Sequence, residues 1–172
     1  GADRPMVRDL VTAEHVHAKT GLNGVDWDDP TMPLAEGHGV QFIIETLRSH
    51  DAGSVTICAM GPLTNIGMAL QQAADIAARI AEIVLMGGGF FEGGNISPAA
   101  EFNIFVDPHA AQRVFAAGIP LVVMPLDVTH KALTTRPRVD AFRSMGTKVG
   151  EMVAAWTDFF ERFDKEKYGS EG

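Results

Sequence analysis

The sequence predicts an α/β fold with an open, mostly parallel central sheet and helices on both of its faces. Short apolar runs rich in β-branched residues recur along the chain, which is typical of strands buried on both faces. Segments with apolar residues at helical spacing lie between these runs, and such alternation predicts a parallel sheet. The 172 residues, 46% of them hydrophobic, suffice for a core, so we expect a single domain over residues 1–172.

Periodicity and chain breaks define the expected elements. Residues 1–35 are rich in Gly, Pro, Asp and Thr without a sustained period, so we expect loop with short pieces of strand or helix. Apolar residues from Val40 to Leu47 share one helical face. Asp107-Pro108 is a typical helix start. The later elements are, in order, helix 36–50, strand 54–60, helix 65–78, strand 82–86, a helix from 107 to Gly118, strand 120–124 and a helical region 138–167.

Several residues carry more local predictions. Thr64 or Asn65 is expected to cap the helix that follows the first strand. The apolar stripe from Val149 to Phe163 has helical spacing, which favours core packing, with a flap over a binding site as the alternative. Cys58 lies in an apolar run and is expected to be buried and inert. It is the one cysteine, so no intrachain disulfide can form, and a reducing, cytoplasmic compartment fits.

Charge and hydropathy argue against two classes of partner. The net charge of −8 disfavours a nucleic-acid backbone and an anionic membrane surface, since both attract basic proteins. No apolar run approaches the ~20 residues needed to span a bilayer. The first five residues lack the hydrophobic segment of a signal peptide. We therefore expect no nucleic acid and no membrane among the partners.

Polar side chains collect after the ends of the expected strands, where parallel α/β sheets bind ligands. These residues are Asn95, Ser97, Glu101, Asn103, Asp107 and Asp127. In the run 95–103 a carboxylate is flanked by two carboxamides, which suits the vicinal hydroxyls of a sugar. The alternative is a loop whose side chains satisfy the backbone of its own turns.

Two other patterns are weaker. The glycines 87–89 and 93–94 do not match a phosphate-binding loop, so they are expected to allow sharp turns or close approach of the backbone. His15 and His17 would share a face on a strand and could begin a metal site. No companion ligands accompany them, so a surface or core pair is the favoured interpretation.

Several motifs together resemble the inosine-uridine preferring nucleoside hydrolase family, the nucleoside N-ribohydrolases, in their order along nearly the whole chain. The motifs are Glu14-His15-Val16-His17 with Gly21-Leu22, Gly61-Pro62-Leu63-Thr64-Asn65, Ile83 to Gly89, Asn95 with Ala99-Ala100-Glu101-Phe102-Asn103 and Asp107-Pro108, and Leu126-Asp127-Val128-Thr129-His130. The resemblance implies an open α/β fold and hydrolysis of the N-glycosidic bond of ribonucleosides. It also implies a Ca²⁺ ion that binds the attacking water and the ribose hydroxyls. The transition state would resemble an oxocarbenium ion.

The resemblance also assigns roles to single residues. Asn95, Glu101 and Asn103 match ribose-hydroxyl contacts, Asn95 and His17 are the candidate catalytic residues, Met86 and Phe102 match substrate-binding positions, and the backbone carbonyl of Met60 matches a calcium ligand. His17 would lie near the base, and Ala18 follows it where the family more usually has glycine. His130 is given a structural role.

Two motifs of the family do not occur in this sequence. The aspartate-rich loop that supplies two calcium ligands and the general base is absent, as is the C-terminal His-Asp pair. Asp26, Asp28 and Asp29 follow the histidine loop instead of preceding it, so they are interpreted as a solvated acidic turn. The chain thus resembles the middle portion of such an enzyme, either as a piece of a longer protein or as a degenerate one.

These gaps leave the function open between three hypotheses. The first is a nucleoside hydrolase, with a ribonucleoside as substrate, that is complete in a longer form and forms a dimer or tetramer. The second is a non-catalytic ribose or nucleoside binder, and the third is a subunit-interaction protein. We expect the isolated chain to be inactive and to associate, because the sheet would expose an edge or a face.

Overall fold

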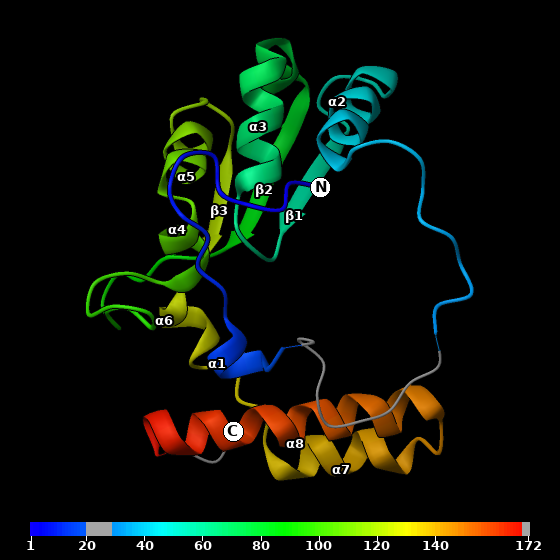
Figure 1. Ribbon diagram of the computed structural model, residues 1–172, viewed down its shortest axis with the longest axis vertical. Coiled ribbons are helices and arrows are strands. Elements are labelled where there is room, and N and C mark those ends of the chain that lie inside the picture. Colours follow the sequence, from blue (N-terminus) through cyan, green and yellow to red (C-terminus); the bar gives the residue numbers. More distant parts are fainter. Residues whose placement is uncertain (20–28, 170–172) are drawn as a thin grey trace. The chain divides into compact units, whose positions relative to one another are not determined.

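The computed structural model describes residues 1–19 and 29–169, and the described residues form two compact units. The first unit contains Gly1–Val11 and Leu34–Lys131, and the second contains Thr12–Pro33 and Ala132–Gly172. The first unit holds the sheet and the second is helical (Figure 1). The single domain expected over residues 1–172 stays a prediction.

The sheet has three parallel strands in the order β1-β2-β3, which confirms the predicted open parallel sheet. The strands are β1 Val55–Ala59, β2 Ile80–Met86 and β3 Leu121–Met124. Ala59 pairs with Leu85, and Met86 pairs with Met124, so the carboxyl ends of all three strands lie along one edge. Parallel neighbours require a crossover, and each crossover here is helical.

The helices follow the predicted order with two additions. In the first unit they are α2 Gly39–Ser49, α3 Thr64–Gln72, the 3-10 helix η1 Ala74–Arg79, α4 Phe102–Val106, α5 Pro108–Phe115 and α6 Leu126–Thr129, and in the second unit α1 Glu14–His17, α7 Arg136–Ser144 and α8 Lys148–Tyr168. The short helices α4 and α6 were not predicted, because four or five residues are too few to show a period. The helical region expected over 138–167 is two helices, separated where Gly146 has a φ of +62° and Thr147 caps α8.

The core of the first unit lies between one face of the sheet and the helices α2, α3 and α5. Ile83 and Leu85 of β2 are fully buried there, with Leu47 of α2 and Val114 of α5. Alternate residues of β1 and β3, among them Ile57 and Val123, pack against the same cluster. Side chains of a strand alternate between the two faces of the sheet, so this packing buries only the side chains on one face.

The opposite face of the sheet is open over the described residues. Thr56 and Cys58 of β1 are exposed, and Val122 and Met124 of β3 are 39% and 37% exposed. The expectation that Cys58 is buried was therefore wrong. Its position in an apolar run suggested a strand covered on both faces, whereas the described helices cover the other face.

The N-terminal residues 1–11 are held against the first unit by polar contacts. The Ala2 N–H donates to Asn65 Oδ1 at 2.8 Å, and the Met6 N–H donates to Asp107 Oδ2 at 2.9 Å. The Arg8 guanidinium donates to the Phe105 carbonyl and lies 4.2 Å from the centre of the Phe105 ring. This segment therefore belongs to the sheet-bearing unit although 22 residues of the other unit follow it.

The second unit is built on the helical hairpin of α7 and α8. Asp158 of α8 forms ion pairs with Arg136 and Arg143 of α7, and Arg136 also pairs with Glu161. Burial disfavours ionisation of Asp158, but the hydrogen bond from Arg136 and the charge of Arg143 outweigh it and hold its pKa below the usual range.

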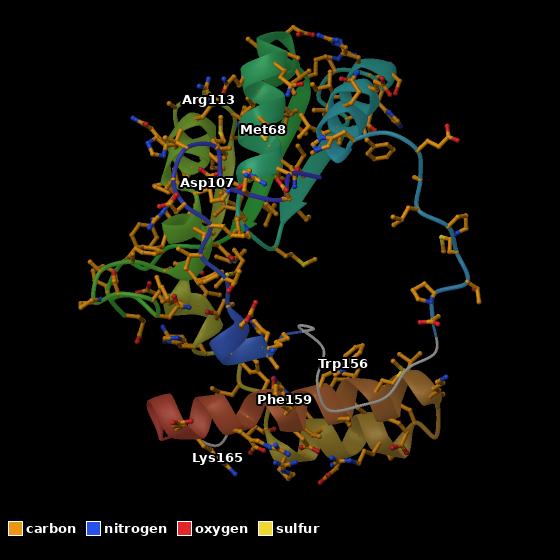
Figure 2. The ribbon with its side chains drawn as sticks, in the orientation of Figure 1. Met68, Asp107, Arg113, Trp156, Phe159 and Lys165 are labelled. Atoms are coloured by element: carbon orange, nitrogen blue, oxygen red, sulfur yellow. The ribbon has the colours of Figure 1, made fainter. Side chains whose placement is uncertain are left out.

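The apolar stripe of α8 is only partly covered within its unit. Figure 2 shows Trp156 and Phe159 on α8, and both are half-buried. Val149 is 69% exposed and Phe160 is 38% exposed. No stripe residue whose side chain the structure describes is fully buried, so the choice between core packing and a flap stays open.

Candidate functional site

Glu101 is a buried, hydrogen-bonded carboxylate at the carboxyl edge of the sheet. It is 2% exposed and caps α4, accepting the N–H of Asn103 at 2.9 Å on Oε1 and the N–H of Ile104 at 3.2 Å on Oε2. Oε2 also accepts the N–H of Gly88 at 3.0 Å, which ties α4 to the loop after β2. Three donors leave this carboxylate one of its roughly four lone-pair sites.

The two asparagines of the run 95–103 lie on either side of Glu101. Asn95 Oδ1 accepts the N–H of Phe102 at 2.8 Å, so it fixes the start of α4. Asn103 Nδ2 donates to the Met86 carbonyl at 3.1 Å. Asn103 Oδ1 accepts no hydrogen bond from the described residues, so it can still accept one from a hydroxyl.

These contacts combine the two interpretations of the run 95–103. Asn95 and Glu101 satisfy backbone donors of their own loop, as the turn interpretation expects. The same bonds fix the side chains rigidly at the carboxyl edge, as a sugar site needs. The structure brings Met86, Asn95, Glu101, Phe102 and Asn103 together through these contacts.

The glycines around this run serve turns and close contacts, as predicted. Gly88 has a φ of +77°, a conformation that favours glycine. A Cβ on Gly94 would lie 2.3 Å from both the nitrogen and the oxygen of Ala100, so that loop has no room for a side chain. The backbone of the predicted sugar loop is therefore tightly constrained by its own sequence.

Met60 and Met86 lie at the carboxyl edge of the sheet: Met60 directly follows β1, and Met86 is the last residue of β2. Met60 follows Ala59, which pairs with Leu85, so Met60 comes directly opposite the end of β2. The side chain of Met60 is 86% exposed. This position suits a contact through the backbone of Met60, which is the contact that the sequence predicts.

His17 lies in the second unit, at the end of α1. Its ring stacks on Phe160 of α8 with centroids 5.4 Å apart. His15 and His17 lie in the short helix α1, so the condition under which they would share a face, a strand, is not met. Ala18 has a φ of +56° with extended ψ, a conformation strained for any residue but glycine, which matches the family's preference there.

Sequence reasoning noted Asp107 and Asp127 as polar residues after strands, expected Asp107 to begin a helix and gave neither a role in the site. Asp107 is fully buried and accepts three hydrogen bonds. Asp127 accepts the backbone N–H groups of Phe90 and Phe91, each at 2.8 Å. The one signal that could have indicated this contact is an aspartate three residues after the end of β3, the strand that pairs with β2, because the glycine loop follows β2.

The described residues contain no cluster of acidic, histidine or cysteine side chains for a metal ion. Calcium prefers six to eight oxygen ligands, several of them carboxylates. In residues 1–19 and 29–169 no group of three or more His, Cys, Asp or Glu side chains could hold a metal ion. Asp29 is exposed, and Asp26 and Asp28 lie outside the described residues. The Met60 carbonyl is therefore a single candidate ligand, and further ligands would have to come from elsewhere.

A hollow of about 620 Å³ lies away from this chemistry, between the N-terminal residues and the helices α2 and α3. It is lined by Gly1, Ala2, Asp3, Arg4, Pro5, Met6, His38 and Met68. None of these is a predicted site residue, so we place the candidate site at the carboxyl edge on the strength of its polar contacts.

Among the described residues no helix is long and apolar enough to cross a membrane.

Comparison with known families gives one match over the full chain. The profile of the family described as inosine-uridine preferring nucleoside hydrolase matches residues 1–172. A pyrimidine-specific ribonucleoside hydrolase of Salmonella enteritidis is 43% identical, and the match covers 100% of this chain and 55% of that protein. An uncharacterised protein of Schizosaccharomyces pombe is 47% identical, and the match covers 100% of this chain and 56% of that protein.

Solved structures give the same result for the fold. A purine-preferring ribonucleoside hydrolase from Gardnerella vaginalis aligns with a TM-score of 0.91 at 30% identity, over 98% of this chain and 55% of that one. A plant nucleoside hydrolase aligns with a TM-score of 0.82 at 29% identity, over 94% of this chain and 50% of that one. The chain thus spans about half the length of the relatives it matches.

Proposed function

The chain belongs to the inosine-uridine preferring nucleoside hydrolase family, and on that premise we propose that it carries the ribose-binding loop of an enzyme that hydrolyses ribonucleosides. The reaction adds water across the N-glycosidic bond and yields a free base and ribose. Because the chain covers about half of its relatives' length, the proposal concerns the protein of the family's full length.

The observation that carries this proposal is the fixed array of Asn95, Glu101 and Asn103. Four backbone donors and the Met86 carbonyl hold these side chains in place before any ligand binds. Such preorganisation lowers the free energy lost on ordering the site during binding. The open acceptors of Glu101 and Asn103 suit hydroxyl donors, and ribose presents two adjacent hydroxyls.

The Glu101 carboxylate also suits the chemistry of the bond that breaks. Positive charge develops on the ribose ring as the base leaves, as in glycoside hydrolysis generally. A fixed, buried carboxylate at the sugar would stabilise that charge without reorganising during the reaction. Glu101 is 2% exposed, so water would screen this interaction little.

Calcium stays a proposal drawn from the resemblance. We propose that the Met60 carbonyl is one ligand and that the carboxylate ligands come from outside the described residues. Asn95 as a catalytic residue, Met86 and Phe102 as substrate contacts, and His17 near the base are proposed on the same basis. The likeness to a pyrimidine-specific and to a purine-preferring enzyme leaves the preferred base undecided.

The proposed setting is a cytoplasmic homo-oligomer, on the sequence grounds of one cysteine and the family resemblance. The open face of the sheet supports association, because apolar side chains of β3 are exposed there. Association with other protein surface would remove that face from water.

A non-catalytic nucleoside binder is the second candidate. It is favoured by one observation, that the described residues offer an array for the sugar but no group for a metal ion. The two candidates differ in ribose release: a hydrolase frees ribose from inosine or uridine, whereas a binder only gains thermal stability from them.

The test is an assay of the purified full-length protein with inosine and uridine, with and without added Ca²⁺, alongside Asn103→Leu in the same protein. Ribose release that falls at least tenfold in Asn103→Leu supports the hydrolase, since about 1.4 kcal/mol corresponds to that factor. Thermal stabilisation without ribose release supports the binder. No release and no stabilisation would refute both.

A further inference from the structure

The loop from Gly87 to Glu92 connects β2 to the predicted sugar site, and hydrogen bonds hold its backbone from two sides. On one side, Glu101 Oε2 accepts the Gly88 N–H at 3.0 Å. On the other, the carbonyl of Gly88 accepts the Leu126 N–H at 2.9 Å. A single residue, Gly88, therefore links the Glu101 carboxylate to the first residue of α6 through its N–H and its carbonyl.

Asp127, the next residue of α6, accepts two further hydrogen bonds from the backbone of this loop. Its Oδ2 accepts the Phe90 N–H and its Oδ1 accepts the Phe91 N–H, each at 2.8 Å. Hydrogen bonds to a charged acceptor are about twice as strong as neutral ones. They also hold the pKa of Asp127 below its usual range, with the Phe90 N–H as the largest cause.

The side chains of the loop offer no packing that could replace these bonds. The Phe90 side chain is 71% exposed and the Phe91 side chain 95% exposed. His130 and Glu92 add a longer ion pair at 3.5 Å. Since the rings are not buried, backbone contacts must fix the loop, and Asp127 provides two of them.

We propose that Asp127 is a positioning residue for the ribose site: it fixes the loop 87–92, which in turn holds the Gly88 N–H against the Glu101 carboxylate. This rests on the proposed function, because the array around Glu101 is taken to bind ribose. The role is indirect, since Asp127 bonds to the loop backbone and Glu101 is its neighbour through Gly88 and Leu126.

The variant to test is Asp127→Asn in the natural full-length protein. An asparagine has the same shape, but its amide group can accept only one of the two N–H groups and sets a donor against the other. The matched control is Asp51→Asn, which removes a charge from an exposed aspartate of the same unit, far along the chain from the loop.

Two measurements separate positioning from plain stability. Hydrogen exchange at the amides of Phe90 and Phe91 should quicken by about tenfold or more in Asp127→Asn, while amides of β2 and β3 keep their rates. Ribose binding, followed by NMR titration, should weaken several-fold, and KM for the nucleoside should rise more than kcat falls. A loss of fold alone would lower the active fraction without raising KM.

Each outcome decides the question. Faster loop exchange with weaker ribose binding supports the proposal, even if no nucleoside is hydrolysed, in which case only the hydrolase proposal fails. Unchanged exchange, or faster exchange with unchanged ribose binding and KM, overturns the role of Asp127. If the unaltered protein binds neither ribose nor nucleoside, the positioning role and the ribose site both fail.

Discussion

Thr64 and Asp107 are joined in the core of the first unit, where the Thr64 hydroxyl donates to Asp107 Oδ2 at 2.7 Å across 43 residues of sequence. Thr64 is 8% exposed and Asp107 fully buried. The same carboxylate accepts the N–H groups of Met6 and Ala110. Asp107, labelled in Figure 2, thus connects the N-terminal segment, α3 and α5.

Asp107→Ala should lower the free energy of unfolding by about 3 kcal/mol or more, because it leaves two buried donors and the half-buried Met6 N–H without an acceptor. Urea denaturation followed by circular dichroism measures this. Thr64→Val, which removes one of the three donors and keeps the shape, should cost only about 1 kcal/mol. Equal losses in the two variants would contradict the central place of Asp107.

Gly67→Ala should destabilise the packing of α3 on α5 by about 1–3 kcal/mol, the usual cost of overpacking. A Cβ at Gly67 would lie 2.8 Å from the Ala110 Cβ and 2.9 Å from its Cα. Thermal unfolding checks the loss. Gly53→Ala is a useful comparison: its surroundings are open but its φ is +75°, so backbone strain alone acts there. Unchanged stability in Gly67→Ala would show that the helices separate freely.

Ala18→Gly should stabilise the second unit by about 1 kcal/mol, because Ala18 adopts a φ of +56° with extended ψ that only glycine takes without strain. Chemical denaturation gives the difference. Ala13→Gly, at the N-terminal cap of α1 with a negative φ, should give no such gain. A loss of stability in Ala18→Gly would mean that the strain at Ala18 is absent in solution.

Val122→Lys combined with Met124→Lys should reduce self-association of the 172-residue chain. Both side chains lie on the open face of the sheet and are more than a third exposed. Two buried charges in an interface between sheets would be strongly unfavourable. Sedimentation velocity reports the association state. Val7→Lys, at a 70% exposed position outside the sheet, is the control. Association that persists in the double variant would place the contact elsewhere.

Acidification should release the loop held by Asp127. The pKa of this carboxyl lies below its usual value of 3.8, because the Phe90 and Phe91 N–H groups favour the ionised form. The stabilisation is complete above the unfolded pKa and is lost as pH falls through the lower folded pKa. NMR titration of the side-chain carboxyl carbon should give a midpoint below 3.8.

The same titration has an internal check. In Asp127→Asn the acid-dependent shift of the Phe90 and Phe91 amides should disappear, because the titrating group is gone. A midpoint for Asp127 at or above 3.8 would contradict the two hydrogen bonds.

Much of the fold was predictable because its signals are local. The runs 54–60, 82–86 and 120–124 became β1, β2 and β3 with small changes at their ends. The Asp107-Pro108 pair began α5, since the Asp107 side chain accepts the Ala110 N–H and proline needs no donor there. The expectation that Thr64 or Asn65 caps α3 was wrong, because α3 has no side-chain cap. The Thr64 hydroxyl bonds to Asp107 and Asn65 Oδ1 accepts the Ala2 N–H, and no local rule contains these long-range contacts.

The residues of the candidate site were also identified from sequence, whereas their connections were not. Asn95, Glu101 and Asn103 are a recognisable pattern within nine residues, and they do gather at one edge. Two contacts follow only from the alignment of β2 and β3. Glu101 accepts the Gly88 N–H, and Asp127 accepts the N–H of Phe91 in the same loop, 36 residues earlier.

The sequence by itself determined which segments are strands and longer helices, which family the chain resembles and which side chains could face a sugar. These depend on periodicity, caps and short motifs, which act over a few residues. Only the tertiary structure decided that one sheet face, with Cys58, is open, that Asp107 is a buried junction and that two carboxylates hold one glycine loop. Those features depend on which distant segments pack together, and burial and long-range hydrogen bonds exist only after the chain has folded.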